Sequence, residues 1–296
     1  PDGVSMDRPS AARMYDYFLG GYHNFAIDRE AAERTIAIYP EFPLVMRTNR
    51  AFLRRAVRFL AQEGIDQFLD LGSGIPTVGN VHEVAQATNP AARVVYVDAD
   101  PIAVAHSKAI LEGNQRTFVM QADVRRPEQI LHQVKSQRLL DLERPVALLL
   151  VYLLHFIPDD AVAYGVAPFL LDAMRSGSYL VLSHGSSQGL PDEAAAQLLQ
   201  IYARTTTPVR VRSYEQIRSF FDGLQLLEPG LVYNPLWRPE SQHDLLLDHP
   251  ERSLGFAGIA LKTDSGNEPP RRQDQTAQEH PIDDHRDDPK NAGRAG

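Results

Sequence analysis

The chain has 296 residues, which is enough for one or two domains and for a core that needs no covalent cross-links. Hydrophobic residues make up 43% and charged residues 23% of it, as in ordinary globular proteins. The formal net charge is −8, which argues against a polyanion-binding protein with a broad basic face. Because cysteine is absent, the sequence excludes disulfides, thiolate metal sites, a cysteine nucleophile and cysteine-ligated iron–sulfur clusters.

No segment shows the order of basic, apolar and small residues that marks a signal peptide. The longest apolar run, from Val146 to Leu154, is far shorter than the ~20 residues that span a bilayer. We therefore expect a cytoplasmic protein that has no membrane partner.

Apolar spacing and the positions of Gly, Pro and Asp divide most of the chain into alternating helices and strands. In chain order, we expect a helix over 41–62, a strand over 68–71, a helix over 78–87, a strand over 93–97, a helix over 101–111, a strand over 117–120, a helix over 127–134, a strand over 146–151, a helix over 161–174, a strand over 179–183, helices over 192–204 and 214–221, and strands over 226–234 and 256–262.

This alternation predicts an α/β fold: a doubly wound, mostly parallel, Rossmann-like sheet of seven strands with helices on both faces. The last two strands are expected to form an antiparallel edge. Residues 1–63 precede the first strand and are predicted to form an N-terminal helical cap, while 64–263 form the α/β domain. Residues 264–296 hold Ile282 as their only large aliphatic residue, so we predict a disordered tail.

The most informative run is Asp70-Leu71-Gly72-Ser73-Gly74, where a strand enters a turn that opens onto a helix. Ligands of open parallel sheets bind at the carboxyl ends of the strands, and glycines let the backbone approach them closely. Thr77 stands where a dinucleotide fingerprint needs glycine, and Pro76 lacks a backbone donor. A carboxylate at Asp70 repels a pyrophosphate and suits an ammonium group.

Two further acids follow the next two strands. Asp98 closes the second strand, where a carboxylate can accept hydrogen bonds from both ribose hydroxyls. Asp123 follows the third strand, where it can meet an adenine amino group, while Asp100 is expected to cap the next helix. Acids at the ends of three consecutive strands suit a cationic adenosine ligand better than NAD.

These three acids and the Gly-x-Gly turn resemble the first three motifs of class I S-adenosylmethionine-dependent methyltransferases. Leu154-His155-Phe156-Ile157-Pro158-Asp159 resembles the Leu-His-x-x-Pro-Asp run of many members. Pro76 replaces the usual third glycine of that superfamily.

The N-terminal residues indicate which family within this superfamily the chain resembles. The run from Pro9 to Gly21, with Asn24-Phe25 and Asp28-Arg29-Glu30-Ala31, resembles the S-adenosyl methyltransferase family long known as a domain of unknown function in actinobacteria. Gly72-Ser73-Gly74-Ile75-Pro76-Thr77 also fits that family. The resemblance covers residues 9–262 and implies S-adenosylmethionine as cofactor, but it brings no settled substrate.

The resemblance also implies residue roles. Asp70 would hold the methionine ammonium group, Asp98 the ribose and Asp123 the adenine amino group. Val124 would pack on the adenine ring, and the glycines would let the backbone pass the methionine portion. The full predicted cofactor set is Tyr15, Gly21, Asn24, Asp70, Gly72, Ser73, Gly74, Asp98, Ala99, Asp123 and Val124.

Four N-terminal aromatic residues are candidates for a lid over the cofactor, with Gly20-Gly21 as its turn. An aromatic face near a sulfonium adds an attraction of about 0.5–2 kcal/mol. The alternative is that these aromatics only anchor the N-terminal helices to the core. The four residues are Tyr15, Tyr17, Tyr22 and Phe25.

Methyl transfer requires an aligned nucleophile and the exclusion of water, and it needs a base only when the nucleophile carries a proton of high pKa. Candidate catalytic residues are His155, Tyr152 and His184, which lie just beyond strands, although a structural role for either histidine is the alternative. We expect no metal site.

Five arginines over 47–58 are interpreted as a solvated face, with an anionic partner as the alternative: Arg47, Arg50, Arg54, Arg55 and Arg58.

We predict a methyltransferase that transfers a methyl group to O or N of a small molecule. The Asp/Asn-Pro-Pro-Tyr/Phe motif of nucleic-acid amino-methyltransferases is absent after the fourth strand, so no nucleic-acid partner is expected. One alternative is a non-catalytic, regulatory protein that binds S-adenosylmethionine. The other is an NAD-dependent oxidoreductase, which Asp70 and Thr77 disfavour. The sequence leaves the oligomeric state open.

Overall fold

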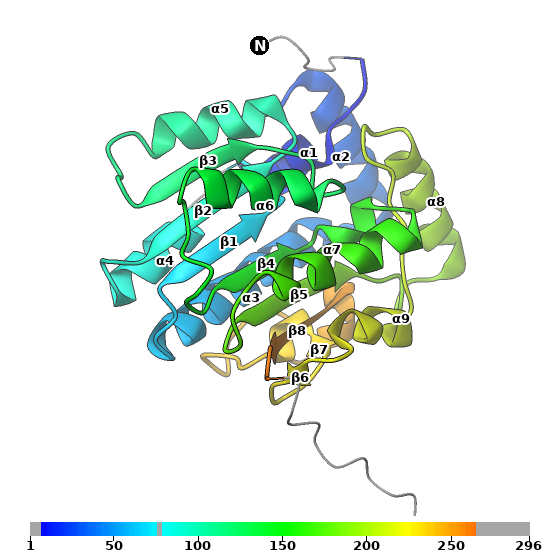
Figure 1. The fold of residues 1–296 in the computed structure, drawn as a ribbon. Coiled ribbons are helices and arrows are strands. Elements are labelled where there is room, and N and C mark those ends of the chain that lie inside the picture. Colours follow the sequence, from blue (N-terminus) through cyan, green and yellow to red (C-terminus); the bar gives the residue numbers. More distant parts are fainter. Residues whose placement is uncertain (1–6, 76–78, 265–296) are drawn as a thin grey trace, which may run out of the picture. The chain divides into compact units, whose positions relative to one another are not determined.

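The computed structural model describes residues 7–75 and 79–264 (Figure 1). These residues belong to one compact unit. The predicted disordered tail falls almost entirely outside the described residues, as do Pro76, Thr77 and Val78.

An eight-stranded, mostly parallel sheet forms the centre of the fold, in the order β3-β2-β1-β4-β5-β8-β6, with β7 paired to β8. The predicted α/β class and the antiparallel edge are confirmed, because β8 pairs antiparallel with β5, β6 and β7. The strand order reverses between β1 and β4, which is where open α/β sheets bind ligands. The parallel strands are β1 (Gln67–Leu71), β2 (Arg93–Asp98), β3 (Thr117–Gln121), β4 (Ala147–Val151) and β5 (Tyr179–Gly185), and the others are β6 (Gln225–Leu226), β7 (Val232–Tyr233) and β8 (Gly255–Leu261).

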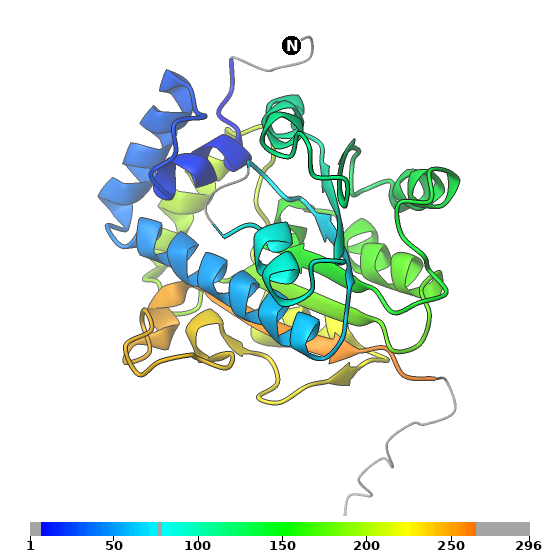
Figure 2. The same ribbon diagram turned by 90° about the vertical axis from the view of Figure 1, so that its left-hand side faces the viewer.

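Helices cover both faces of the sheet, because alternate strand residues point to opposite faces. Leu69 and Leu71 of β1 pack with α6, α7 and α9, whereas Phe68 packs with α3 and α4. Figure 2 shows α3 and α4, blue and cyan, crossing one face. The helices are α1 (Ala11–Phe18), α2 (Ala26–Ile38), α3 (Phe42–Gln62), α4 (Val81–Thr88), α5 (Pro101–Ile110), α6 (Pro127–Ser136), α7 (Asp160–Asp172), α8 (Asp192–Ala203) and α9 (Tyr214–Arg218).

Three predicted elements differ from the structure. The strand expected over 226–234 is wrong: Pro229 and Gly230 form a turn that separates the two-residue strands β6 and β7. The helix expected over 78–87 begins at Val81, because Asn80 and Glu83 form a capping box there. The helix expected over 214–221 ends at Arg218, and a 3-10 turn continues it to Phe221.

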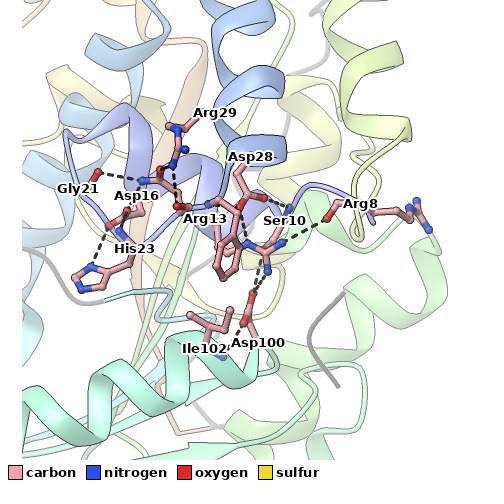
Figure 3. Close-up of polar contacts among 12 residues, drawn as sticks. Arg8, Ser10, Arg13, Asp16, Gly21, His23, Asp28, Arg29, Asp100 and Ile102 are labelled. Atoms are coloured by element: carbon pink, nitrogen blue, oxygen red, sulfur yellow. Dashed lines mark hydrogen bonds and ion pairs between the residues drawn. The ribbon is translucent and has the colours of Figure 1, made fainter. Parts of the chain in front are cut away.

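The first helices are fixed beside the carboxyl edge of the sheet by a buried ion pair. Arg13 of α1 contacts Asp28 of α2 at 2.7 Å, and the Asp28 side chain is fully buried. Asp28 also accepts hydrogen bonds from the backbone N–H groups of Ser10 and Phe25. The Ser10 hydroxyl donates to Asp100 at 3.0 Å, and the Arg13 guanidinium reaches the same carboxylate (Figure 3). Since Asp100 caps α5, as predicted, this network ties the N-terminal helices to the sheet domain.

Arg13→Met tests this ion pair. Removing one partner of a buried pair leaves the charge of Asp28 uncompensated, so we expect a loss of about 3–5 kcal/mol in the free energy of unfolding, measured by chemical denaturation. Arg34→Met, on the exposed face of α2, is the matched control and should change it by less than about 0.5 kcal/mol. Equal stability of both variants would contradict a structural role for the pair.

Candidate functional site

A cavity of about 480 Å³ lies at the carboxyl ends of the central strands. Residues of α1, α3 and α8 form its other walls, so the N-terminal helices enclose the edge at which ligands of this sheet type bind. Its size lies within the usual range for small-molecule sites.

The turn after β1 approaches the cavity closely because two glycines adopt positive φ values. Gly72 has φ +68°, and a Cβ there would lie 2.5 Å from the Leu153 side chain. Gly74 has φ +65°, and its N–H donates to Asp98 Oδ2 at 2.7 Å. Asp98 Oδ1 accepts the N–H of Asp100 at 2.8 Å. The carboxylate that closes β2 therefore braces the turn that follows β1, and burial raises its pKa to about 6.

Asp70 is the central acidic group of the cavity. Its exposed fraction is 5%, and burial raises its pKa to about 7. The Arg50 guanidinium partly offsets that rise, whereas the neighbouring Asp98 adds to it. Like Phe68, Asp70 points to the face of the sheet that α3 covers, which explains why a basic side chain of α3 acts on it.

Arg50 is a site residue that the sequence analysis missed. It lines the cavity, its Nη2 donates to Asn80 Oδ1 at 2.8 Å, and its buried Nε has no partner among the described residues. The interpretation of the five arginines as a solvated face is wrong for two of them. Arg50 is half-buried against the cavity, and Arg55 is buried and donates to the carbonyls of Asn234 and Trp237. The sequence did contain a sign of this role. Arg50 stands one helical turn after Met46, so it lies at the border of the apolar face of α3.

The N-terminal candidates divide into two groups. Tyr15 lines the cavity, and its hydroxyl donates to the carbonyl of Met46 and accepts from Asn49. Gly21 and Asn24 do not line it; they pack around the buried carboxylate of Asp16, which accepts from Asn24 Nδ2 at 2.9 Å.

The predicted aromatic lid is only partly present. Tyr22 is 93% exposed, Tyr17 donates to Glu33, and Phe25 lies beneath the guanidinium of Arg13. Tyr15 is the one member of the four that lines the cavity, and its neighbours in this wall are Ser10, Ala11, Ala12, Arg13 and Phe18.

At the end of β3, the structure separates two residues that the sequence analysis had grouped. Val124 lines the cavity, together with Ala122 and Arg125, but Asp123 does not. The Asp123 carboxylate instead forms an ion pair with Arg125 at 2.5 Å, and this hydrogen bonding lowers its pKa. Ser73 and Ala99, also predicted as cofactor contacts, do line the cavity.

Two of the three candidate catalytic residues line the cavity. The Tyr152 hydroxyl donates to the carbonyl of Ser253 and accepts from Asn234 Nδ2, and burial raises its pKa. His155 Nδ1 accepts the N–H of Gly185 at 3.3 Å, so the ring carries its proton on Nε2. Burial lowers the pKa of His155 well below its usual range.

His184 is fully buried and does not line the cavity. Its Nδ1 lies 2.7 Å from the carbonyl oxygen of Gly185, and its Nε2 lies 3.1 Å from Arg212 Nη1. Burial lowers its pKa to about 3, so the ring is neutral and both nitrogens are engaged. This geometry fits the structural role that the sequence analysis held as the alternative.

Within residues 7–75 and 79–264, no group of three or more His, Asp or Glu side chains is placed to hold a metal ion. In the same described part of the chain, no helix is both long enough and apolar enough to cross a bilayer.

Comparison with known proteins decides the family. A profile of the S-adenosyl methyltransferase family matches residues 1–263. The chain belongs to this family. A solved protein from Thermobifida fusca YX that carries a provisional methyltransferase assignment is 43% identical, with 89% of this chain and 98% of that one covered and a TM-score of 0.82. A DUF574 family protein from Streptomyces avermitilis MA-4680 is 38% identical, with 86% and 98% covered and a TM-score of 0.81. No curated protein matches the sequence.

The protein is thus an S-adenosylmethionine-dependent methyltransferase, and S-adenosylmethionine is its cofactor. Both expectations from the sequence resemblance are confirmed at this level.

Asp70→Asn tests the cost of the buried carboxylate in the ligand-free protein. The pKa of Asp70 is about 7 in the folded protein and ordinarily 3.8. The free energy of unfolding therefore falls as pH rises from about 4 to 7, because the folded protein must then bury an ionised carboxylate. We therefore expect Asp70→Asn to unfold at a higher temperature than the wild type at pH 8, and the gap to narrow by pH 5. Thermal unfolding at both pH values measures this, with the exposed Asp172→Asn as control. A variant less stable than the wild type at pH 8 would show that the ionised Asp70 carboxylate does not destabilise the folded protein.

Proposed function

We propose that S-adenosylmethionine binds with its methionine end between Arg50 and Asp70, its ribose at Asp98 and its adenine against Val124, and that the protein methylates O or N of a small molecule. The observation that carries this proposal is the pair of opposite charges from α3 and β1. An amino-acid zwitterion needs one cationic and one anionic partner on the same wall of a cavity, and Arg50 and Asp70 supply them.

The state of both groups supports this assignment. Arg50 has a buried Nε without a partner among the described residues, and a carboxylate is the ligand that satisfies such a donor best. Asp70 has a raised pKa because it is desolvated, and a bound ammonium group would restore the charged form. A pyrophosphate would instead meet the Asp70 carboxylate, which disfavours the nicotinamide alternative.

The ribose and adenine assignments rest on the loops after β2 and β3. Asp98 Oδ2 accepts the N–H of Gly74 and Oδ1 that of Asp100, and a carboxylate has about four acceptor positions, so the group can also accept from a ribose hydroxyl. Ala99 and Val124 offer apolar contacts to the adenine ring. The ion pair at Asp123 does not support the predicted contact with the adenine amino group, so we assign this residue to the positioning of Arg125 instead.

When bound, S-adenosylmethionine supplies a methyl group already activated on a sulfonium. The chain's own residues then need to enclose the acceptor, align it and exclude water. The walls from α1, α3 and α8 around the cavity support enclosure of a small molecule. Membership in a methyltransferase family favours this function over a non-catalytic regulator.

Arg50→Met tests the carboxylate anchor. Losing one hydrogen-bonded charge contact costs about 1.5–3 kcal/mol, so we expect calorimetry to show S-adenosylmethionine affinity lower by roughly 10- to 150-fold. Arg47→Met removes an exposed arginine of the same helix and should leave the affinity unchanged. An Arg50→Met protein that binds as tightly as the wild type would refute the anchor.

Asp98→Ala tests the ribose assignment by the same titration. We expect S-adenosylhomocysteine, the demethylated product, to bind more weakly by about 1–3 kcal/mol, because the variant loses the acceptor of two hydroxyl groups. Unchanged affinity would rule out a ribose contact at this residue.

A further inference from the structure

The cavity has two chemically different halves. Its charged lining residues come from α1, α3, the ends of β1 and β2 and the segments after β2 and β3, and they are Arg13, Arg50, Asp70, Asp98, Asp100 and Arg125. The lining from Val151 onward, contributed by the segments after β4 and β5, by α8 and by the loop that follows it, contains no Asp, Glu, Lys or Arg among the described residues. The second half therefore disfavours an anionic ligand, because no cationic side chain among these lining residues compensates a desolvated negative charge.

Aromatic rings line this uncharged half and the parts of α1 and α3 that adjoin it. The Tyr202 ring of α8 lies 6.3 Å from the Phe42 ring and 6.4 Å from the Phe156 ring, measured between centroids. Phe18 and Leu198 extend the same apolar lining. Faces of aromatic rings attract a positive charge, and such rings recognise quaternary ammonium groups in other proteins.

Among the described residues that line this half, no Tyr or His side chain is prepared to accept a proton. Tyr152 and Tyr202 are neutral because burial raises their pKa values, and the Tyr152 hydroxyl is already held by Ser253 and Asn234. His155 uses Nδ1 for the N–H of Gly185 and carries its proton on Nε2, so its ring offers a donor and no free lone pair. An acceptor that must lose a proton of high pKa would find no base here.

We propose that this half is the acceptor site and that it takes an uncharged aromatic molecule with a nitrogen lone pair, a conclusion that rests on the proposed binding of S-adenosylmethionine in the charged half. The nitrogen lone pair forms the new N–CH₃ bond while the S–CH₃ bond breaks, and its electron pair returns to sulfur as a neutral thioether. The positive charge moves from sulfur to nitrogen, and no proton has to leave. Phe42, Phe156 and Tyr202 stabilise that cation.

Three bicyclic probes of similar size test the proposal with S-adenosylhomocysteine bound: isoquinoline, 2-naphthol and 2-naphthoate. We expect calorimetry at pH 8 to detect isoquinoline and 2-naphthol, and 2-naphthoate to bind at least tenfold more weakly than either. With S-adenosylmethionine, mass spectrometry should find N-methylisoquinolinium formed at least tenfold faster than methylated 2-naphthol.

Each contrary outcome is informative. Equal or tighter binding of 2-naphthoate would overturn the uncharged site, and faster methylation of 2-naphthol would overturn the absence of a base. Binding of S-adenosylhomocysteine without any probe, or of isoquinoline without methylation, would refute the acceptor assignment alone. Failure of S-adenosylhomocysteine itself to bind would refute the proposed function instead.

Two neighbouring alanines of α8 provide matched variants. Ala195 lines the cavity, whereas Ala196 is exposed and does not. We expect Ala195→Trp to weaken isoquinoline binding at least tenfold with S-adenosylhomocysteine affinity unchanged, and Ala196→Trp to change neither. Leu199→Arg, at a half-buried lining position, introduces a charge and should have the effect of Ala195→Trp. Wild-type isoquinoline affinity in both lining variants would place the acceptor elsewhere.

Discussion

A carboxylate buried at the reversal point of the strand order is the constraint on which the rest of the site depends. Asp70 ends up beneath the helices that cover β1, where its ionised form is poorly solvated. Arg50 of α3 supplies the opposite charge. Because α3 follows α1 and α2 directly, the site also requires those helices to be held against the sheet, and the buried network of Arg13, Asp28 and Asp100 does so. The helices α1 and α3 therefore form part of the cavity wall.

The division of charge in the cavity gives each half a separate task. In the proposed binding mode, Arg50 and Asp70 recognise a zwitterion and Asp98 holds a ribose. In the proposed acceptor half, apolar and aromatic groups exclude water and leave recognition to shape and to the faces of aromatic rings. A neutral histidine and neutral tyrosines suit a reaction in which the leaving group is already activated and the nucleophile needs no base.

Local sequence patterns predicted the sheet, the Gly-x-Gly turn after β1 and the carboxylate of Asp98 that braces this turn. The Gly-x-Gly turn and Asp98 follow strands whose apolar runs are unmistakable, and both line the cavity as expected. The strand over 226–234 was mispredicted because a turn within it interrupts an otherwise apolar run.

Residues whose roles depend on tertiary contacts were predicted less well. Arg50 was missed because only the packing of α3 on β1 distinguishes it from its exposed neighbours. Gly21 and Asn24 belong to a family-like run, but their contacts are to Asp16 and not to the cavity. Asp123 stands at the right strand end, yet a neighbouring arginine takes its carboxylate.

The most direct test of the central claim is a crystal structure of the protein with S-adenosylhomocysteine. We expect the amino-acid carboxylate at Arg50, the ammonium group at Asp70 and the ribose hydroxyls at Asp98, with the sulfur facing the aromatic half of the cavity. A ligand whose amino-acid end lies away from both Arg50 and Asp70 would contradict it.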